Sequence, residues 1–276
     1  MPAAQSLTIV LPAFNEADRI GPALDELFGY LRRRDASGRA GSPGSAALPP
    51  EIEVLVVDDG STDATASLVA ARPESGSAQI PGVNLRVLTV PHAGKGAAVR
   101  AGMLDASSDI AIFADADMAT PPDQLPLLVR ALETSDVALG SRIQPDGSDM
   151  RASQPLFRRL LGKAFRLVAS AWVAGPVQDT QCGFKGFTRE SAHDLFARQR
   201  ITSFAFDAEV IYLARRRGYR VAIVPIHWAD RAGSRMRARP MLALRVGWDL
   251  LRIPLIHRSV PRTTPHGVDG NGGAAH

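Results

Sequence analysis

The chain has a single cysteine, no long apolar run and neither of the two common glycine-rich phosphate signatures. One cysteine, Cys182, excludes a disulfide scaffold and a zinc site built from several cysteines. No stretch reaches the ~20 apolar residues of a membrane-spanning helix, and the N-terminus lacks the basic residues of a signal peptide, so we expect the chain to stay in the cytosol. Without G-x-G-x-x-G or G-x-x-x-x-G-K-[ST], a dehydrogenase or P-loop enzyme has no basis.

The composition is that of an ordinary globular protein, but its charge is unevenly distributed. The 276 residues are 45% hydrophobic and 22% charged, which excludes a disordered or fibrous chain. Residues 1–138 carry 10 Lys and Arg against 18 Asp and Glu, whereas residues 139–276 carry 22 against 10. An acidic half suits a cation and a basic half suits phosphates. The basic half also suits nucleic acid, but no nucleic-acid-binding module is present, so we predict no such partner.

Short apolar runs alternate with helical periodicity through the first half of the chain. The runs predict strands at residues 7–11, 53–57, 85–90, 109–114 and 136–140. Helical spacing lies between them, at residues 20–31, 62–71, 97–106 and from Pro121 onward. This alternation predicts an α/β fold with a mostly parallel, Rossmann-like sheet flanked by helices.

The second half is less regular. We expect helices at residues 155–174, 206–217 and 241–256, and a strand at 220–228. Residues 1–240 are assigned to one domain, residues 241–257 to a C-terminal amphipathic helix and residues 258–276 to a disordered tail.

Charged residues follow each of the first five predicted strands, where ligands bind in sheets of this kind. Asp115-Ala116-Asp117 follows the fourth strand, and two carboxylates one residue apart can hold Mg²⁺ or Mn²⁺ with positions left for phosphate oxygens. Asp58-Asp59 follows the second strand and suits a ribose or the N–H edge of a base, although a turn and cap role is the alternative. Gly94-Lys95-Gly96 enters a helix N-terminus and suits a phosphate.

These clusters, taken in order, carry a resemblance to a known family. LPAFNEADRI, VLVVDDGSTDAT, GKGAAVRAGM, FADADMATPPDQL and LGSR resemble the inverting glycosyltransferases of family 2, which have the GT-A fold. DTQCGFKGFTRESAHDLF, FAFDAEVIYLARRRGY and VPIHWADRAGSRMR are similar to dolichyl-phosphate glucosyltransferases and their polyprenyl-phosphate relatives. The likeness covers roughly residues 6–240, and the second group of motifs is the more specific.

The resemblance implies a role for individual positions. The nucleotide sugar would meet Pro12, Ala13, Phe14, Glu16, Asp58, Asp59, Lys95, Asp115, Ala116 and Asp117, with the metal on Asp115 and Asp117. The acceptor phosphate would meet Arg142, Arg158, Ser234 and Arg235. Ala119 stands where mannosyl relatives often have Gln, which suits the glucosyl branch, and Arg235 replaces a usual lysine.

We therefore predict inverting transfer of glucose from UDP-glucose to a polyprenyl phosphate, with Mg²⁺ or Mn²⁺ as cofactor. The catalytic residues would be Asp117, Arg142 and Asp207, with Asp179 and Gln181 near the sugar or diphosphate. Transfer from GDP-mannose and transfer to a soluble acceptor are the alternatives, and a soluble acceptor would need a general base, for which Asp207 is the first candidate. A non-catalytic nucleotide-sugar-binding protein is a third reading, and the intact aspartates and arginines argue against it.

Two predicted helices indicate contact with a membrane surface. Residues 155–174 and 241–256 combine Leu, Phe and Trp with Arg, a composition that lets a helix lie among lipid headgroups. Core packing with a solvated face is the alternative for both. We expect a peripheral protein on the inner, cytoplasmic face of the membrane.

Overall fold

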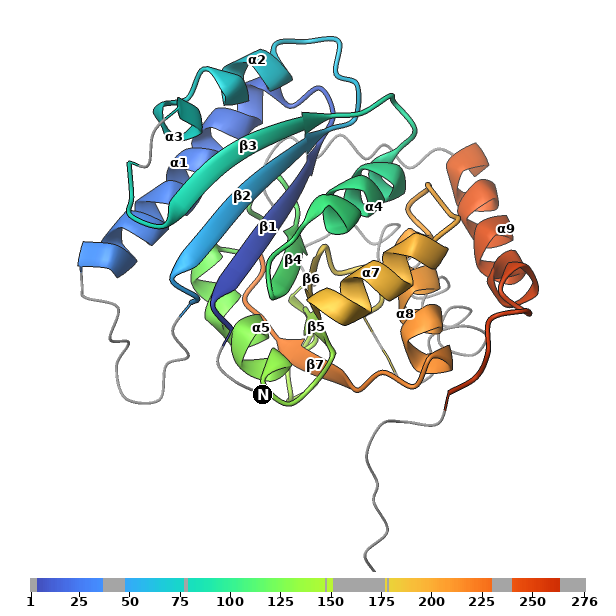
Figure 1. Ribbon diagram of the computed structural model, residues 1–276. Helices are drawn as coiled ribbons and strands as arrows, with labels where there is room; N and C mark the ends of the chain where they lie inside the picture. The colour runs from blue at the N-terminus through green and yellow to red at the C-terminus, as the bar shows by residue number, and fades with distance from the viewer. Residues whose placement is uncertain are drawn as a thin grey trace, which may run out of the picture.

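A seven-stranded sheet forms the centre of the part that the computed structural model describes, which comprises residues 4–36, 48–76, 79–146, 148–150, 177, 179–229 and 240–263. The spatial order of the strands is β3-β2-β1-β4-β6-β5-β7 (Figure 1). Their bounds are β1 Ser6–Ala13, β2 Glu51–Asp58, β3 Val83–Thr89, β4 Ile110–Ala114, β5 Val137–Ser141, β6 Phe184–Thr188 and β7 Val221–Pro225. All six predicted strands are confirmed, with β7 shorter than expected.

Strand β6 is the one that the sequence did not predict. It runs antiparallel to both β4 and β5 and separates them, whereas β1 pairs in parallel with β2 and β4, β2 with β3, and β5 with β7. The sheet is therefore mostly parallel, as expected, with one reversed strand inside it. The strand is only five residues long, and its sequence FKGFT interrupts the apolar run with Lys185 and Gly186, which disfavours a strand assignment.

Helices cover both faces of the sheet. On one face lie α1 (Ala17–Ala36), α2 (Thr65–Ala70), α3 (Pro73–Gly76) and α5 (Leu125–Leu132), the last preceded by the short helix η1 (Pro122–Gln124). On the other lie α4 (Lys95–Asp105), α7 (Arg189–Arg198) and α8 (Phe206–Arg216), with α9 (Pro240–Ile256) packed against α8 (Figure 1). Helix α7 was not predicted.

Alternation along the central strand assigns its side chains to two separate cores. Leu7, Ile9 and Leu11 of β1 belong to the core under α1 and α5, while Val10 packs into the core under α4, α7 and α8. Because burial on both faces requires nearly every side chain to be apolar, such strands appear in the sequence as continuous apolar runs. This is why β1, β2 and β4 were predictable.

The C-terminal part agrees with the sequence as far as α9 and differs just beyond it. Residues 258–263 dock on α8: Arg216 donates to the carbonyl oxygens of Arg258 and Val260, and the amide of Thr263 donates to the carbonyl oxygen of Arg216. The predicted disordered tail is therefore wrong for residues 258–263, because these backbone groups have hydrogen-bond partners on α8. Residues 264–276 and the predicted helix at 155–174 lie outside the described residues. No helix in the described ranges is both long and apolar enough to cross a bilayer.

Candidate active site

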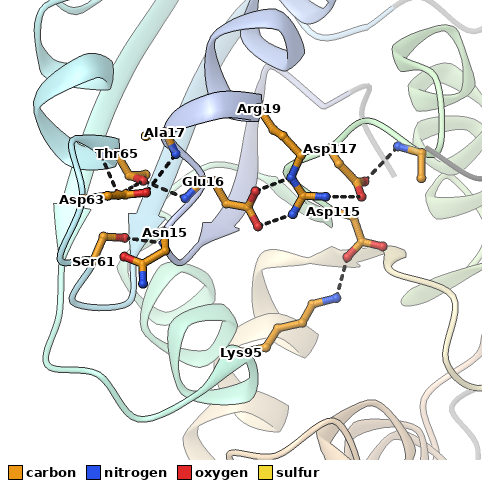
Figure 2. A network of polar contacts seen from close by, with 11 residues as sticks. Asn15, Glu16, Ala17, Arg19, Ser61, Asp63, Thr65, Lys95, Asp115 and Asp117 are labelled. Atoms are coloured by element: carbon orange, nitrogen blue, oxygen red, sulfur yellow. Dashed lines mark hydrogen bonds and ion pairs between the residues drawn. The ribbon is translucent and has the colours of Figure 1, made fainter. Parts of the chain in front are cut away.

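The turn between β1 and α1 is fixed by the loop that follows β2. Three consecutive backbone amides donate to side chains of that loop and of the first residue of α2: Asn15 to Ser61 at 2.9 Å, Glu16 to Thr65 at 2.8 Å and Ala17 to Asp63 at 3.2 Å. Asn15 has a φ of 54°, the left-handed conformation that Asn tolerates better than most residues. The turn therefore places the Glu16 side chain toward the carboxyl end of β4 (Figure 2).

An exposed aromatic pair lies at the ends of β1 and β3. The rings of Phe14 and His92 stack with centroids 4.1 Å apart, and Phe14 is 38% exposed. Buried Asp59 orients this pair, because its carboxylate accepts the amides of Ala93 and Gly94 at 2.9 and 3.0 Å and lies 2.9 Å from Nδ1 of His92. A flat, oriented ring surface of this kind can receive a nucleobase.

Asp58 precedes Asp59 in the chain, but its carboxylate stabilises the turn after β2. Its two buried carboxylate oxygens both accept the amide of Ser61, at 3.3 Å. The turn role that the sequence left open is thus the one visible in the structure. Pro12 and Ala13 are the last residues of β1, in register with Val57 and Asp58, and they directly precede the turn.

Two acidic residues at the end of β4 each have a basic neighbour. Lys95, the first residue of α4, donates to Asp115 at 2.5 Å. One nitrogen of Arg19 lies 3.8 Å from an Asp117 oxygen, while two others donate to Glu16 at 2.6 and 2.5 Å. Figure 2 shows the resulting row of alternating charges, Glu16–Arg19–Asp117 and Asp115–Lys95. Predicted residues that follow β1 and β4 thus converge with the first residue of α4 at one edge, joined by Arg19, which was not predicted as a site residue.

The electrostatics of the acid pair suit a divalent cation. Burial and the charge of Asp115 raise the pKa of Asp117, so the two carboxylates are close enough for the charge of Asp115 to disfavour ionisation of Asp117. Burial alone would lower the pKa of Lys95, but Asp115 and Asp207 outweigh it and raise that pKa. No group of three His, Cys, Asp or Glu side chains suited to a metal occurs among the described residues. Mg²⁺ commonly uses one or two carboxylates with substrate phosphates, and Asp115 and Asp117 fit that pattern.

The loop before β6 sets the position of Asp115. The amide of Asp115 donates to the carbonyl oxygen of Gly183 at 3.0 Å. A Cβ atom at Gly183 would lie 2.2 to 2.4 Å from the Asp115 carboxylate, so only glycine leaves room for it there. The unpredicted strand therefore enters the site through the loop that precedes it.

Beneath the acid pair lies a buried ion pair between β6 and α8. Lys185 is fully buried and donates at 2.5 Å both to Asp207 and to the carbonyl oxygen of Cys182. Burial raises the pKa of Asp207 although Lys185 and Lys95 oppose the shift. Because Lys185 already binds this buried carboxylate, the expectation that Asp207 is the first candidate for a general base is not supported by its placement. The sequence feature that could have indicated this buried ion pair is a single lysine between apolar residues at position 185.

Arg142 is engaged on the opposite side of the site. Its Nε and Nη2 donate to Asp179 at 2.8 and 2.6 Å, and its backbone amide donates to the same carboxylate at 2.9 Å. Burial alone would lower the pKa of Arg142, but Asp179 outweighs it and keeps that pKa above its usual value. The guanidinium also lies 5.6 Å from the centre of the Trp228 ring. The side chain is thus held in one orientation at the end of β5.

Two further motif residues, Glu209 and Cys182, are buried and serve the fold. Glu209 is fully buried and accepts the amides of Arg200 and Ile201 at 2.9 and 2.8 Å, with Nε2 of His257 at 2.6 Å. Burial raises the pKa of Cys182 to about 12, so this thiol stays protonated and inert. Arg158, Ser234 and Arg235 lie outside the described residues, and their acceptor role stays a prediction.

Comparisons with known proteins point to the same family as the sequence motifs. The family described as Glycosyl transferase family 2 matches residues 8–196. A dolichyl-phosphate beta-glucosyltransferase of Trichomonas vaginalis is 35% identical over 261 residues, covering 91% of this chain and 72% of that protein. The proteins of that name from Drosophila melanogaster and Homo sapiens are 36% and 32% identical, covering 90% and 91% of this chain and 74% and 75% of theirs.

A solved structure has the same fold. The glucosyl-3-phosphoglycerate synthase of Mycobacterium tuberculosis, in complex with Mn²⁺, UDP and glucosyl-3-phosphoglycerate, superposes with a TM-score of 0.57 at 22% identity. The match covers 90% of this chain and 80% of that one. The described sheet and its flanking helices are thus a GT-A arrangement, as the sequence predicted.

Proposed function

The chain belongs to glycosyl transferase family 2, and from that membership we propose that it transfers glucose from UDP-glucose to a polyprenyl phosphate of the dolichyl type. The observation that carries the proposal is the convergence of Asp115 and Asp117 with Lys95 and Arg19 at the carboxyl edge of the sheet. That edge offers carboxylates for a cation and cations for a diphosphate. The names of the relatives supply the sugar and the acceptor.

The donor binds between the aromatic pair and the acid pair. Phe14 and His92 receive the base, with Asp59 fixing their orientation. Asp115 and Asp117 hold Mg²⁺ or Mn²⁺, which when bound stabilises the negative charge of the departing diphosphate. Lys95 is the first residue of α4 and lies beside Asp115, so its ammonium group also stabilises the negative charge of the departing diphosphate.

Transfer is a single displacement. A phosphate oxygen of the acceptor forms a bond to the anomeric carbon of glucose, and the bond from that carbon to the diphosphate breaks with its electron pair leaving on UDP. The acceptor is an anion near neutral pH, since the second pKa of a phosphate monoester is about 6, so no general base is required. Attack opposite the leaving group inverts the anomeric centre. This chemistry is consistent with Asp207 being buried on Lys185 rather than exposed to substrate.

Arg142 orients the acceptor phosphate. Asp179 accepts hydrogen bonds from its Nε and Nη2, and the guanidinium has further N–H donors on Nη1. A pre-oriented guanidinium positions an anion at small entropic cost. Because the acceptor phosphate is already anionic, it needs positioning rather than deprotonation. Arg158, Ser234 and Arg235 are proposed to complete this acceptor side.

The lipid acceptor brings the protein to a membrane surface through α9. Leu250 and Ile253 of this helix are buried, whereas Trp248, Leu251 and Leu255 are 65%, 49% and 67% exposed. A helix with an exposed apolar stripe can lie among headgroups at the inner, cytoplasmic face.

Radiolabelled UDP-glucose and GDP-mannose, each with Mn²⁺ and polyprenyl phosphate, test the proposal. We expect label in the organic phase from UDP-glucose alone, and Asp117→Asn to lower the rate about 100-fold or more. Asp123→Asn removes an equally charged but exposed carboxylate and is the matched control. Label from GDP-mannose alone would make the protein a mannosyltransferase. Label confined to water-soluble products would give a soluble acceptor, and an unchanged rate in Asp117→Asn would refute the role of the acid pair.

A further inference from the structure

Arg19 occupies a position that a cation would not favour by itself. It lies in the first turn of α1, where the helix dipole favours anions. Its guanidinium is shared: Nε and Nη2 donate to Glu16, and Nη1 lies 3.8 Å from Asp117 (Figure 2). Glu16 in turn is held by its backbone amide on Thr65. The surrounding structure therefore holds a positive charge beside one of the two proposed metal-binding carboxylates.

The charges at this edge nearly cancel when no ligand is bound. Glu16, Asp115 and Asp117 supply three negative charges, and Arg19 and Lys95 supply two positive ones. Each member of the acid pair thus has a basic neighbour: Lys95 forms an ion pair with Asp115, and Arg19 lies near Asp117. Nη1 of Arg19 lies 3.8 Å from an Asp117 oxygen, so its charge is close enough to act on this carboxylate. A divalent ion approaching Asp117 meets this opposing charge.

We propose that Arg19 is a counter-ion for Asp117 that makes cation binding at the acid pair depend on the nucleotide sugar. The inference rests on the proposed function, because it requires that Asp115 and Asp117 hold the cation. A diphosphate offers the guanidinium a new anionic partner, and Glu16 keeps the guanidinium within reach of both. With the positive charge turned toward the diphosphate, Asp117 is free to bind the metal. Arg19 is a positioning residue in this scheme.

Such coupling is reciprocal and can be measured without catalysis. The Kd of Mn²⁺, from the paramagnetic resonance signal of the unbound ion, is determined with and without saturating UDP. In Arg19→Gln we expect Mn²⁺ to bind the free protein about fivefold more tightly, and the gain in affinity produced by UDP to shrink by a similar factor. Arg33→Gln removes the same charge from an exposed site about 20 Å further along α1 and should leave both values unchanged.

Glu16→Gln gives a change of the opposite sign. Without the Glu16 carboxylate, Arg19 is left to pair with Asp117, so the free protein should bind Mn²⁺ more weakly. This variant decides the question if Arg19→Gln does not fold, and unchanged affinity in it would then overturn the proposal. A folded Arg19→Gln protein whose Mn²⁺ affinity is unchanged or weaker without UDP overturns it directly.

The proposed function fails in a different way. If Asp117→Asn binds Mn²⁺ as tightly as the unmodified protein in the presence of UDP, the acid pair is not the cation site. The counter-ion role of Arg19 then falls with it.

Discussion

Replacing Gly183 by alanine places a methyl group against the carboxylate of Asp115. The added carbon would lie 2.2 to 2.4 Å from the carboxylate atoms, whereas non-bonded heavy atoms sit at about 3.5 Å, so the two groups must separate by about 1 Å. Gly183 does not have a left-handed φ, so the substitution acts through this contact and not through backbone strain. A misplacement of about 1 Å at a residue that positions the reactants can lower the rate about 100-fold.

The experiment compares Gly183→Ala with Gly186→Ala in the adjoining strand. At Gly186 the added carbon would meet side-chain carbon atoms of Leu132 and Ile112, at 3.0 and 3.3 Å, and these side chains belong to the core. Both variants should lose about 1–3 kcal/mol of stability from overpacking, measured by urea unfolding. Only Gly183→Ala should lose about 100-fold in kcat/KM, together with Mn²⁺ affinity. The reasoning is refuted if its kcat/KM stays within about threefold of that of Gly186→Ala.

Two further predictions concern the buried ion pair and the aromatic pair. Lys185→Met leaves Asp207 buried without its charged partner and should lower the free energy of unfolding by about 3–5 kcal/mol at pH 7. Because burial raises the pKa of Asp207, its carboxyl gains a proton as the pH falls, so the deficit in urea unfolding should shrink toward pH 5, and an equal deficit at both values would contradict this. Phe14→Ala removes half of the stacked pair with His92 and should raise the KM for the donor about three- to tenfold with little change in kcat, whereas unchanged steady-state kinetics would place the base elsewhere.

Much of the fold and part of the site were predictable because each depends on short-range pattern. Strands buried on both faces must be apolar, so β1, β2 and β4 appeared as continuous runs. Parallel strands bring their carboxyl ends to one edge, so the sequence alone groups the residues that follow β1, β2 and β4. The convergence of Glu16, Asp59 and Asp115 at that edge follows from these two rules.

What the sequence did not predict depends on contacts between distant segments. Lys185 is compatible with a strand interior only because Asp207, 22 residues later, supplies its partner, and no local pattern announces that pairing. Arg19 appears as an ordinary residue of a helix first turn until Asp117 is placed beside it. Likewise, Asp207 looks available from its motif, and only the packing of α8 on β6 reveals that its carboxylate is taken.

The buried Glu209 joins the end of α9 to the segment that packs against the start of α4. It fastens His257, just after α9, to the segment beginning at Arg200, whose Thr202 carbonyl receives the amide of Gly96 next to Lys95. These contacts join the end of α9 to the residue that follows Lys95 at the start of α4. If α9 rests on lipid as proposed, we expect the docking of this helix and the position of Lys95 to depend on each other through these contacts.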